Sequence, residues 1–408
     1  MKIAILAPFN PSCICNYLDN CRDSIIDINA NASAVNNIAI GLLKYGQEVT
    51  IITLDPSSRS NRILRGDRVT VHLIGNKPLF KFLLFFPLFS YECNKLRMCL
   101  RGVVDDVDVI HAHWAYQYAN ACLPFAKKKV VCCTYRDWPY AIVDNLSKRP
   151  FLYYVIKRFL WSKRIKMSNN ILKTESVHLI ANSDYMYSFL YNATHDKKRV
   201  NTIYNSIRDD VILKEQLYVD INYTFVAIAA SLDDERKNIL SLVKAFQIIN
   251  KEYPSSKLYL IGPYHQNRSL YQYVLSEDLH QSIRFTGALS HNDVIDIIDK
   301  SLCLVHPSKE ESFGNTLIEA MARCKPVIGG EKSGAVPFVL DFGNCGFLCD
   351  VDSIESIAAA MRKVIKDDKD RKRVVSNATN HLLTNYSNSA SVKKHLELYQ
   401  SLVNECNK

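Results

Sequence analysis

The stretch PSKEESFGNTLIEAMARCKPVIGGEKSGAVPFV, residues 307–339, says most about the fold of this chain. It begins with a polar turn, and Leu317, Ile318 and Met321 then recur near helical spacing. This pattern predicts a helix that opens near Gly314. A helix N-terminus offers unpaired backbone N–H groups and a partial positive charge, so it attracts phosphate.

Two glutamates flank this predicted helix end. Glu311 lies in the turn before it, and Glu319 lies roughly 1.5 turns inside the helix. Carboxylates accept hydrogen bonds from sugar hydroxyls, so two of them beside a phosphate-binding helix end favour a nucleotide sugar as the ligand. The alternative is an ordinary amphipathic helix with acidic residues on its surface.

The order of residues in this stretch is similar to the signature of family 4 of the retaining glycosyltransferases, which have the GT-B fold. That signature contains Pro-Ser, Glu-x7-Glu with Phe-Gly inside it, Glu-Ala-Met-Ala and Pro-Val, and all four occur here between Pro307 and Val327. The resemblance implies two Rossmann-like, doubly wound α/β domains that face each other across a cleft. It also implies a catalytic role for Glu311 and contacts to the donor from Glu311, Phe313, Gly314, Asn315, Thr316 and Glu319.

Strand and helix patterns alternate along the chain, which independently predicts two doubly wound α/β domains. We expect an N-terminal, acceptor-side domain over residues 1–208 and a C-terminal domain that binds the nucleotide sugar over residues 209–388. The terminal helix, about 389–408, is expected to return to the first domain. The first domain should hold a helix at 33–46 and strands at 2–8, 47–53, 69–74, 108–112, 130–134, 178–182 and 200–204; the second should hold strands at 223–230, 257–262, 283–287 and 302–306.

Two histidines lie at the end of one predicted strand of the first domain, at the sheet edge where α/β domains bind ligands. The string Asp108-Val-Ile-His-Ala-His113 resembles the family's Asp-(apolar)2-His-x-His, whose second histidine faces the donor sugar. The resemblance implies a catalytic role for His113, and a hydrogen-bonded structural histidine is the alternative. That alternative is the expectation for His111.

Two further segments of the first domain are expected to form the acceptor side. The family often has His-Asp after the next strand, where this chain has Arg136 and Asp137. Asn31, Ala32 and Ser33 stand where the family usually has two glycines, which let a ligand approach the backbone closely. Their absence puts that contact in question, although Ser33 is placed to cap the following helix.

The loop after residues 223–230 is expected to bind the donor diphosphate. Relatives carry Gly-Arg here, followed by Lys-Gly or Lys-Asn, and Lys237 matches that lysine. Ser231 stands at the usual arginine, so Arg236 is expected to supply the second positive charge. Solvated surface residues are the alternative for this Arg-Lys pair. Gly262, which ends the next predicted strand, completes the expected donor-binding residues.

Composition limits the class of protein. The chain has 408 residues, of which 48% are hydrophobic, as in a globular protein. No apolar run is long enough to span a membrane, and the N-terminus does not resemble a signal peptide. The 13 cysteines are scattered and are expected to be reduced and mostly buried. Cys13, Cys15 and Cys21 lack zinc-site spacing and no Asp-x-Asp motif stands out, so no metal and no cofactor are expected.

Positive charge concentrates in the first half. Residues 1–208 contain 28 Lys and Arg against 15 Asp and Glu, and the remainder contains 23 against 26. Residues 149–166 carry six basic residues, no acidic ones and several aromatic rings, a pattern typical of an interfacial helix. Residues 78–91 are aromatic and almost uncharged. Helices that pack on the sheet are the alternative for both segments. The pattern favours a cytoplasmic protein bound peripherally to the anionic inner face of the cytoplasmic membrane.

The resemblance, together with these observations, implies a retaining, metal-independent hexosyltransferase that uses a nucleotide diphosphate sugar. The expected acceptor is a polyprenyl-linked oligosaccharide of a bacterial surface polysaccharide, such as lipopolysaccharide O-antigen or capsule. A sugar-nucleotide epimerase on the same fold is an alternative that fits Glu311 and Glu319 less well. A basic nucleic-acid-binding protein is a second alternative, but no nucleic-acid motif supports it and we expect no nucleic-acid partner.

Overall fold

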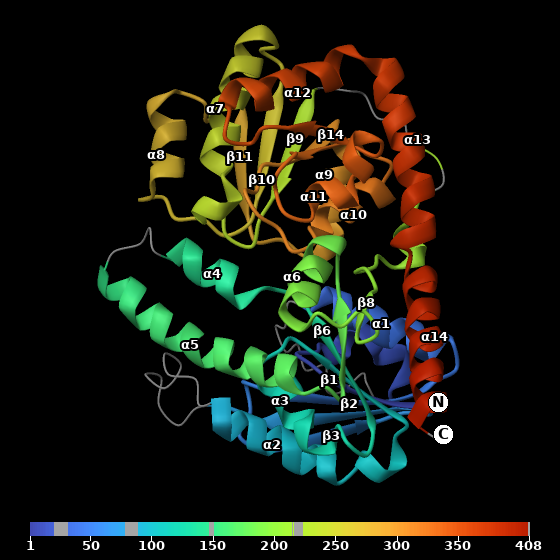
Figure 1. Ribbon diagram of the computed structural model, residues 1–408. Coiled ribbons are helices and arrows are strands. Elements are labelled where there is room, and N and C mark those ends of the chain that lie inside the picture. The colour runs from blue at the N-terminus through green and yellow to red at the C-terminus, as the bar shows by residue number, and fades with distance from the viewer. Residues whose placement is uncertain (20–31, 78–88, 147–150, 214, 216–222, 407–408) are drawn as a thin grey trace. The chain divides into compact units, whose positions relative to one another are not determined.

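The computed structural model describes residues 1–19, 32–77, 89–146, 151–213, 215 and 223–406. They form two compact units, one of residues 1–204 with 391–408 and the other of residues 205–390 (Figure 1). Each unit is an α/β domain built on a largely or wholly parallel sheet, so the predicted fold class is confirmed. None of the described helices combines the length and the apolar character needed to cross a bilayer.

Unit 1 contains an eight-stranded sheet in the order β3-β4-β2-β1-β5-β6-β7-β8. All neighbours pair in parallel except β3, which is antiparallel to β4. Strand β1 reads KIAIL and is buried along almost its whole length, as expected of a strand covered on both faces. The strands are β1 Lys2–Leu6, β2 Glu48–Asp55, β3 Arg62–Arg65, β4 Val69–Gly75, β5 Val109–His113, β6 Val130–Tyr135, β7 Val177–Ala181 and β8 Val200–Thr202.

Helices cover both faces of this sheet and bury two separate apolar cores against it. One core receives Val392, Tyr399 and Leu402 from the terminal helix, most of which therefore belongs to unit 1. The helices are α1 Ser33–Lys44, α2 Phe89–Arg101, α3 Gln117–Cys122, α4 Pro139–Leu146, α5 Phe151–Lys173, α6 Asp184–Thr194 and α14 Asn388–Cys406.

Unit 2 contains a six-stranded sheet in the order β11-β10-β9-β12-β13-β14, in which every pair of neighbours is parallel. Its strands are β9 Thr224–Ile228, β10 Lys257–Ile261, β11 Ile283–Gly287, β12 Cys303–His306, β13 Val327–Gly330 and β14 Phe347–Cys349. Its helices are α7 Ile239–Glu252, α8 Ser269–Ser276, α9 His291–Lys300, α10 Asn315–Ala322, α11 Val336–Val339, α12 Ile354–Lys366 and α13 Asp368–Asn385.

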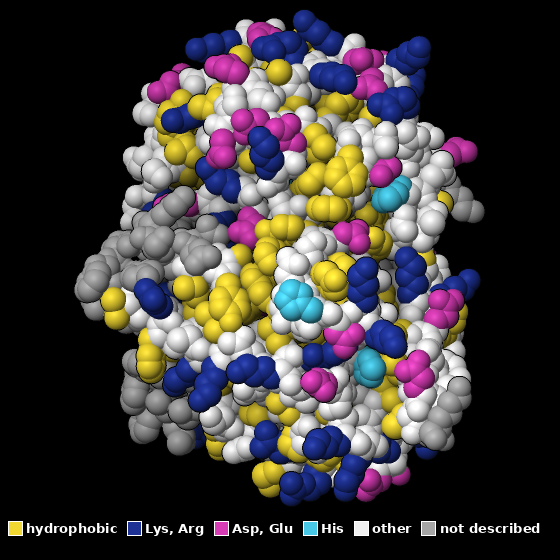
Figure 2. Space-filling view, viewed as in Figure 1, with side chains coloured by type: hydrophobic (Ala, Val, Ile, Leu, Met, Phe, Trp, Pro, Cys, Tyr) yellow, Lys and Arg dark blue, Asp and Glu magenta, His cyan; other side chains and the backbone are white. Residues whose placement is uncertain are grey.

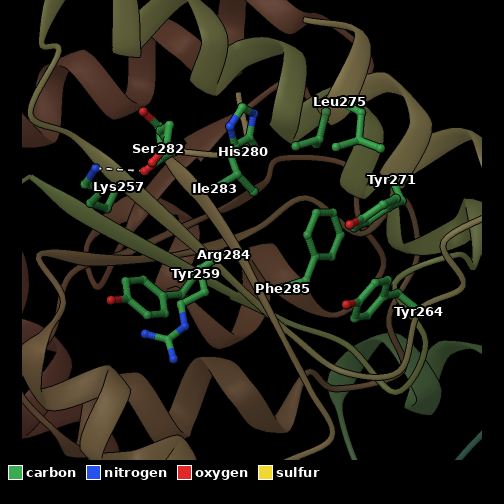
Figure 3. Close-up of a pocket in the computed structure, with 12 residues that line it drawn as sticks. Lys257, Tyr259, Tyr264, Tyr271, Leu275, His280, Ser282, Ile283, Arg284 and Phe285 are labelled. Atoms are coloured by element: carbon green, nitrogen blue, oxygen red, sulfur yellow. Dashed lines mark hydrogen bonds between the residues drawn. The ribbon is translucent and has the colours of Figure 1, made fainter. Parts of the chain in front are cut away.

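The strand β11 lies at one edge of the unit 2 sheet, and aromatic side chains pack helix α8 against it. The rings of Tyr264, Tyr271 and Phe285 come from the loop after β10, from α8 and from β11 (Figure 3). The ring centroids of Tyr264 and Phe285 lie 4.6 Å apart. These rings line one end of a groove of about 410 Å³ along β11. This packing covers part of an edge that would otherwise be open to pairing.

The strand order places the sites for ligands. In unit 1 the chain builds outward from β1 through β2 to β4 and then resumes at β5 on the other side of β1. In unit 2 it builds from β9 to β11 and resumes at β12 on the other side of β9. Ligands of doubly wound sheets bind beyond the carboxyl ends of the strands at such switch points. The strands β5 and β12 that begin the second halves end at His113 and His306.

Several details differ from the expectations. The strands β3, β13 and β14 were not predicted, and β13 and β14 have only four and three residues. Ser33 does not cap its helix: Ala32 occupies the N-cap position without a side-chain hydrogen bond, and Ser33 is the first helical residue. Cys15 is disulfide-bonded, contrary to the expectation of reduced cysteines. Of the apolar segment 78–91, residues 78–88 lie outside the described part of the chain.

Candidate functional site

The carboxyl end of β12 carries a cluster of three ionisable side chains in unit 2. Glu311, in the loop after β12, forms an ion pair with Lys237 and accepts a hydrogen bond from His306 Nε2 at 3.1 Å. The other ring nitrogen of His306 lies 3.2 Å from Thr316 Oγ1 in the first turn of α10. Both Lys237 and Glu311 are largely shielded from solvent. The structure therefore joins two predicted donor residues that lie 74 positions apart in the chain.

The charge of Glu311 is fixed by its neighbours. Burial alone would raise the pKa of this carboxyl, but His306 and Lys237 outweigh burial and hold the pKa of Glu311 well below its usual range. Glu311 is therefore ionised near neutral pH and acts there only as an acceptor. An ionised acceptor in this position is suited to bind sugar hydroxyl groups.

The N-terminus of α10 begins beside this cluster. Gly314 is its N-cap with φ +91°, a left-handed conformation, and a Cβ at this position would lie 2.8 Å from Leu317 Cδ1. The helices α6, α9 and α12 each start with a serine whose side chain accepts a backbone N–H, but α10 has no such cap. The first N–H groups of α10 are thus left for an anionic ligand.

Lys237 reaches this point through a short turn after β9. Residues Glu235–Lys237 form a 3₁₀ turn that Asp234 caps, and the backbone N–H of Lys309 donates to the carbonyl of Arg236 at 2.8 Å. This contact ties the turn to the loop that carries Glu311. Arg236 itself pairs with Asp234 through two hydrogen bonds of 2.7 and 3.2 Å and remains about half exposed.

The other predicted donor residues lie around the same end of the sheet. Ser231 lies in the loop that leads into the 3₁₀ turn, and its carbonyl accepts a hydrogen bond from Asp234 N at 3.3 Å. Gly262 follows β10 with φ +141°, and a Cβ there would lie 2.0 Å from the carbonyl oxygen of Ala229. Only glycine allows this close approach of two loops. Asn315 accepts a hydrogen bond from Asn205 Nδ2 at 2.9 Å.

Phe313 and Glu319 occupy different environments on either side of Gly314. Phe313 is buried and meets the ring of Tyr386 edge-on, with centroids 5.6 Å apart. Glu319 is half-buried in α10, and burial raises its pKa to about 7. The two glutamates of the motif therefore differ in charge state near neutral pH, because Glu311 is paired with Lys237 whereas burial alone acts on Glu319.

In unit 1 the carboxyl ends of β5 and β6 carry a second cluster. Arg136 Nη2 donates to His113 Nδ1 at 3.0 Å, and both residues are buried. Because arginine only donates, the neutral ring must carry its proton on Nε2. Burial, His111 and Arg136 together lower the pKa of His113 far below its ordinary value, so the ring is neutral. Among the described residues, His113 Nε2 has no hydrogen-bond partner.

His111 and Asp137, which neighbour this cluster, have hydrogen-bond partners within unit 1. His111 contacts Tyr399 Oη at 2.5 Å and Thr134 Oγ1 at 2.7 Å, which is the structural role expected of it. Asp137 accepts a hydrogen bond of 2.6 Å from Tyr116 Oη, and burial raises the pKa of Asp137. Of the predicted loop residues 31–33, Asn31 lies outside the described residues and Ala32 is buried.

Sequence reasoning did not single out His306, although it contacts Glu311 and lies next to Thr316. A signal was present in the sequence: His306 ends the predicted strand 302–306, and His113 directly follows the predicted strand 108–112. The Asp-(apolar)2-His-x-His string that marks His113 has no counterpart around His306. Its position at a strand end was therefore the signal that could have identified it as a site residue.

Two known families match the two units separately. Residues 32–211 match the family described as Glycosyltransferase Family 4, and residues 214–381 match Glycosyl transferases group 1. The chain is 24% identical over 316 residues to N-acetyl-alpha-D-glucosaminyl L-malate synthase of Bacillus anthracis, which covers 74% of this chain and 76% of that one. It is 29% identical over 229 residues to the O-antigen chain mannosyltransferase RfbU of Salmonella typhimurium, which covers 54% of this chain and 60% of that one.

A solved structure of another protein has a similar fold. The structure of sucrose-phosphate synthase from Thermosynechococcus elongatus superposes with a TM-score of 0.76 over 98% of this chain and 99% of that chain, at 17% identity. Two doubly wound domains have the architecture of the GT-B fold, and the two family matches assign the chain to the glycosyltransferases. The chain belongs to the family 4-type, or group 1, glycosyltransferases. Neither an epimerase nor a nucleic-acid-binding protein is favoured by these matches.

Proposed function

We propose that this glycosyltransferase moves a hexose from a nucleotide diphosphate sugar to a hydroxyl group, with retention of the anomeric configuration and without a metal ion or other cofactor. The observation that carries the proposal is the contact of Lys237 and His306 with Glu311 beside the uncapped N-terminus of α10. Such an arrangement offers positive groups for a diphosphate and an ionised acceptor for a sugar in one place.

Each group has a defined part in the proposed reaction. The bond between the sugar C1 and the diphosphate oxygen breaks, and the Lys237 ammonium and the N–H groups of α10 stabilise the charge that grows on that oxygen. Arg236 adds to the positive field from the same turn. Glu311 holds hydroxyl groups of the transferred sugar, and Glu319 accepts from the ribose.

The acceptor hydroxyl forms the new bond to C1 and gives its proton to the departing phosphate. This route needs no enzymic nucleophile, in line with the resemblance to retaining family members. His113 Nε2–H is buried without a partner among the described residues and therefore favours a substrate oxygen as its acceptor. Arg136 then acts as a positioning residue, because it holds the proton of His113 on Nε2.

The proposed acceptor is a polyprenyl-linked oligosaccharide used for a bacterial surface polysaccharide. The similarity to an O-antigen chain mannosyltransferase supports this class of acceptor. We propose that unit 1 meets the anionic inner face of the membrane to reach it. Figure 2 shows Lys and Arg side chains gathered over the part of unit 1 that holds α2, α3 and α5, with hydrophobic side chains among them. Met98 on α2 and Phe159 on α5 are among the exposed apolar residues.

A thermal-shift screen over UDP-, GDP- and ADP-sugars tests the donor class. A ligand at 100 times its dissociation constant stabilises the fold by about 2.7 kcal/mol, which a melting curve resolves easily. The expected result is one nucleotide class that stabilises the wild type and not Lys237→Ala, followed by transfer of label from that sugar to a lipid-linked acceptor. Stabilisation by none of the nucleotides, together with salt-dependent retention on a DNA column, would contradict the proposal.

A further inference from the structure

The turn between α11 and β14 holds an unusual backbone. Asp341, Phe342 and Gly343 follow one another with φ of +45°, +50° and +98°. Left-handed conformations at two successive non-glycine residues are costly and persist only where the surroundings impose them. Here Cys345 N donates to the carbonyl of Leu340 at 3.0 Å and closes the turn. Strained backbone of this kind is concentrated at functional sites, so the side chains that this turn brings together are candidates for a binding site.

The turn brings three metal-binding side chains to one point. A carboxylate oxygen of Asp341, the sulfur of Cys345 and a ring nitrogen of His381 all lie within 4.8 Å of one another. Asp341 and Cys345 come from the turn, and His381 comes from α13. One helical turn earlier on α13, Asn377 Nδ2 donates to the carbonyl of Asn344 at 3.2 Å, so the helix is fastened to the turn.

We propose that Asp341, Cys345 and His381 form a binding site for a divalent transition-metal ion, with Zn²⁺ the best match. Thiolate, imidazole and carboxylate are the three side-chain ligands that zinc uses, whereas Mg²⁺ and Ca²⁺ prefer oxygen alone. A tetrahedral ion with ligands at about 2.0–2.3 Å requires the three atoms to close in by about 1 Å, with water as the fourth ligand. On binding, the Cys345 thiol loses its proton to solvent and the sulfur–metal bond takes its place.

The surroundings of His381 suit a ligand. One ring nitrogen lies 3.1 Å from Tyr386 Oη and the other 3.3 Å from Asn385 Nδ2. Coordination through Nδ1 displaces the Asn385 contact and leaves Nε2–H bonded to Tyr386, which holds the plane of the ring as is usual for metal-bound histidines. Cys345 is buried, while Asp341 and His381 are half-exposed, so an ion can enter from solvent.

The site is connected to the donor loop through one side chain. Tyr386 is buried, touches His381 through its hydroxyl group and presents its ring to Phe313. Phe313 directly precedes Gly314 at the start of α10. An ion on His381 therefore stiffens a contact that supports the proposed donor site, so its occupancy should change donor affinity by a measurable factor. This second part rests on the proposed function, while the metal site does not.

Cobalt titration of the full, chelator-stripped chain tests the site without any donor. We expect one equivalent of Co²⁺ to give the near-ultraviolet band of a thiolate–cobalt bond together with the intense visible bands of tetrahedral cobalt, and Zn²⁺ to bleach both. Cys345→Ser should abolish the thiolate band. Cys349→Ser, which alters another buried cysteine of the same unit, should keep it. Asp341→Asn and His381→Gln should weaken binding by tenfold or more, on the order of the losses seen when a metal site loses one supporting group.

A folded wild-type chain without a thiolate–cobalt band, or a band that survives Cys345→Ser, would overturn the proposal. If Cys345→Ser does not fold, the half-exposed His381→Gln decides, and unchanged cobalt affinity in that variant would equally overturn it. Donor affinity with and without Zn²⁺ then tests the connection. A severalfold change in the wild type that His381→Gln abolishes supports it, and no change in the wild type refutes the connection alone.

Discussion

The two units place a histidine at the same point of the same topology and surround it differently. His306 ends β12 in contact with the carboxylate Glu311, which is in turn paired with Lys237. His113 ends β5 and, among the described residues, its side chain accepts one hydrogen bond, from the cation Arg136. A carboxylate partner holds a proton on the histidine nitrogen that faces it, whereas an arginine forces the proton to the opposite nitrogen.

The two clusters differ in which of their polar groups already have partners. In unit 2 the charges of Lys237 and Glu311 compensate each other, so a donor diphosphate must compete with Glu311 for the lysine. In unit 1 the Nε2–H of His113 is buried without an acceptor among the described residues. An unpartnered buried donor costs about 1–3 kcal/mol, which a substrate oxygen would recover. The ionisable groups of the unit 2 cluster thus pair with one another, whereas the unit 1 cluster leaves one buried donor without a partner among the described residues.

The largest expected effect tests the role of charge in unit 2. Lys237→Ala should keep the fold and lower turnover by about two to three orders of magnitude, the scale of one lost transition-state partner. Steady-state kinetics measures this, with Lys309→Ala as the control because Lys309 pairs with Asp352 in the adjoining loop. Near wild-type turnover in Lys237→Ala would remove Lys237 from the site and shift attention to Arg236.

The corresponding change in unit 1 tests whether the lone Nε2–H is used. His113→Ala should lower turnover on the order of a hundredfold, because it removes one fixed hydrogen-bond donor. His113→Gln, which keeps an N–H group, should recover part of the loss. His111→Gln removes a histidine with two protein partners and should lower the melting temperature more than the turnover of the folded enzyme. Equal turnover losses in His111→Gln and His113→Ala would show that both are structural.

The excess of positive charge in unit 1 gives the next prediction. Arg158, Lys163 and Lys166 lie exposed on α5, and each basic residue near an anionic membrane contributes about 1 kcal/mol. Replacing all three with serine should weaken binding to anionic vesicles by roughly one to two orders of magnitude, as measured by co-sedimentation. Arg164 is left intact, because its guanidinium packs on the rings of Phe89, Tyr116 and Trp161.

The charge-matched control for α5 replaces Lys44, Lys127 and Lys128, which are also exposed in unit 1. It should bind vesicles as the wild type does, and raised salt should release both, because the Debye length is only about 10 Å at 0.1 M. Equal binding to neutral and anionic vesicles, or binding to neither, would mean that α5 is not a membrane anchor.

The two glutamates of unit 2 should separate in kinetics. Glu311→Gln should mainly lower turnover, because contacts to the sugar tighten as the bond breaks, whereas Glu319→Gln should mainly raise the Michaelis constant for the donor. Each effect should be roughly tenfold or somewhat more, the scale of a hydrogen bond to a charged group. Two silent substitutions would mean that this stretch does not bind the donor.

The smallest effect concerns pH. Because the pKa of Glu319 is raised to about 7, this carboxyl is protonated below that pH and ionised above it. The ionised form is the better acceptor for ribose hydroxyls, so donor affinity should rise severalfold as the pH increases through about 7. Glu319→Gln should flatten this profile. An unchanged slope in the variant would assign the titration to another group.

The same carboxyl should affect stability with the opposite sign. A carboxyl whose folded pKa exceeds its ordinary value of 4.5 binds protons more tightly in the folded state, so the free energy of unfolding should fall as the pH rises from about 4.5 to about 7. Denaturant unfolding of the wild type and Glu319→Gln should show a smaller fall in the variant, because other buried carboxyls such as Asp137 keep their own contribution.

Much of the fold was accessible from local patterns. Most predicted strands begin and end within one or two residues of their observed limits, because buried parallel strands read as short apolar runs. The missed strand β13 contains two glycines and β14 has only three residues, so neither leaves enough periodic pattern. Ser33 was wrongly expected to cap α1, because a capping residue type one position too late looks the same in sequence.

The sequence by itself determined the two α/β domains, the helix that starts after Gly314 and the residue types that attend it. Those features follow from spacing within a few residues, which a single chain displays directly. Only the tertiary structure decided that Lys237 pairs with Glu311, that His306 joins them and that Arg136 sets the tautomer of His113. These pairings depend on which strand ends the sheet order brings together, and on burial that lets one neighbouring charge outweigh solvent.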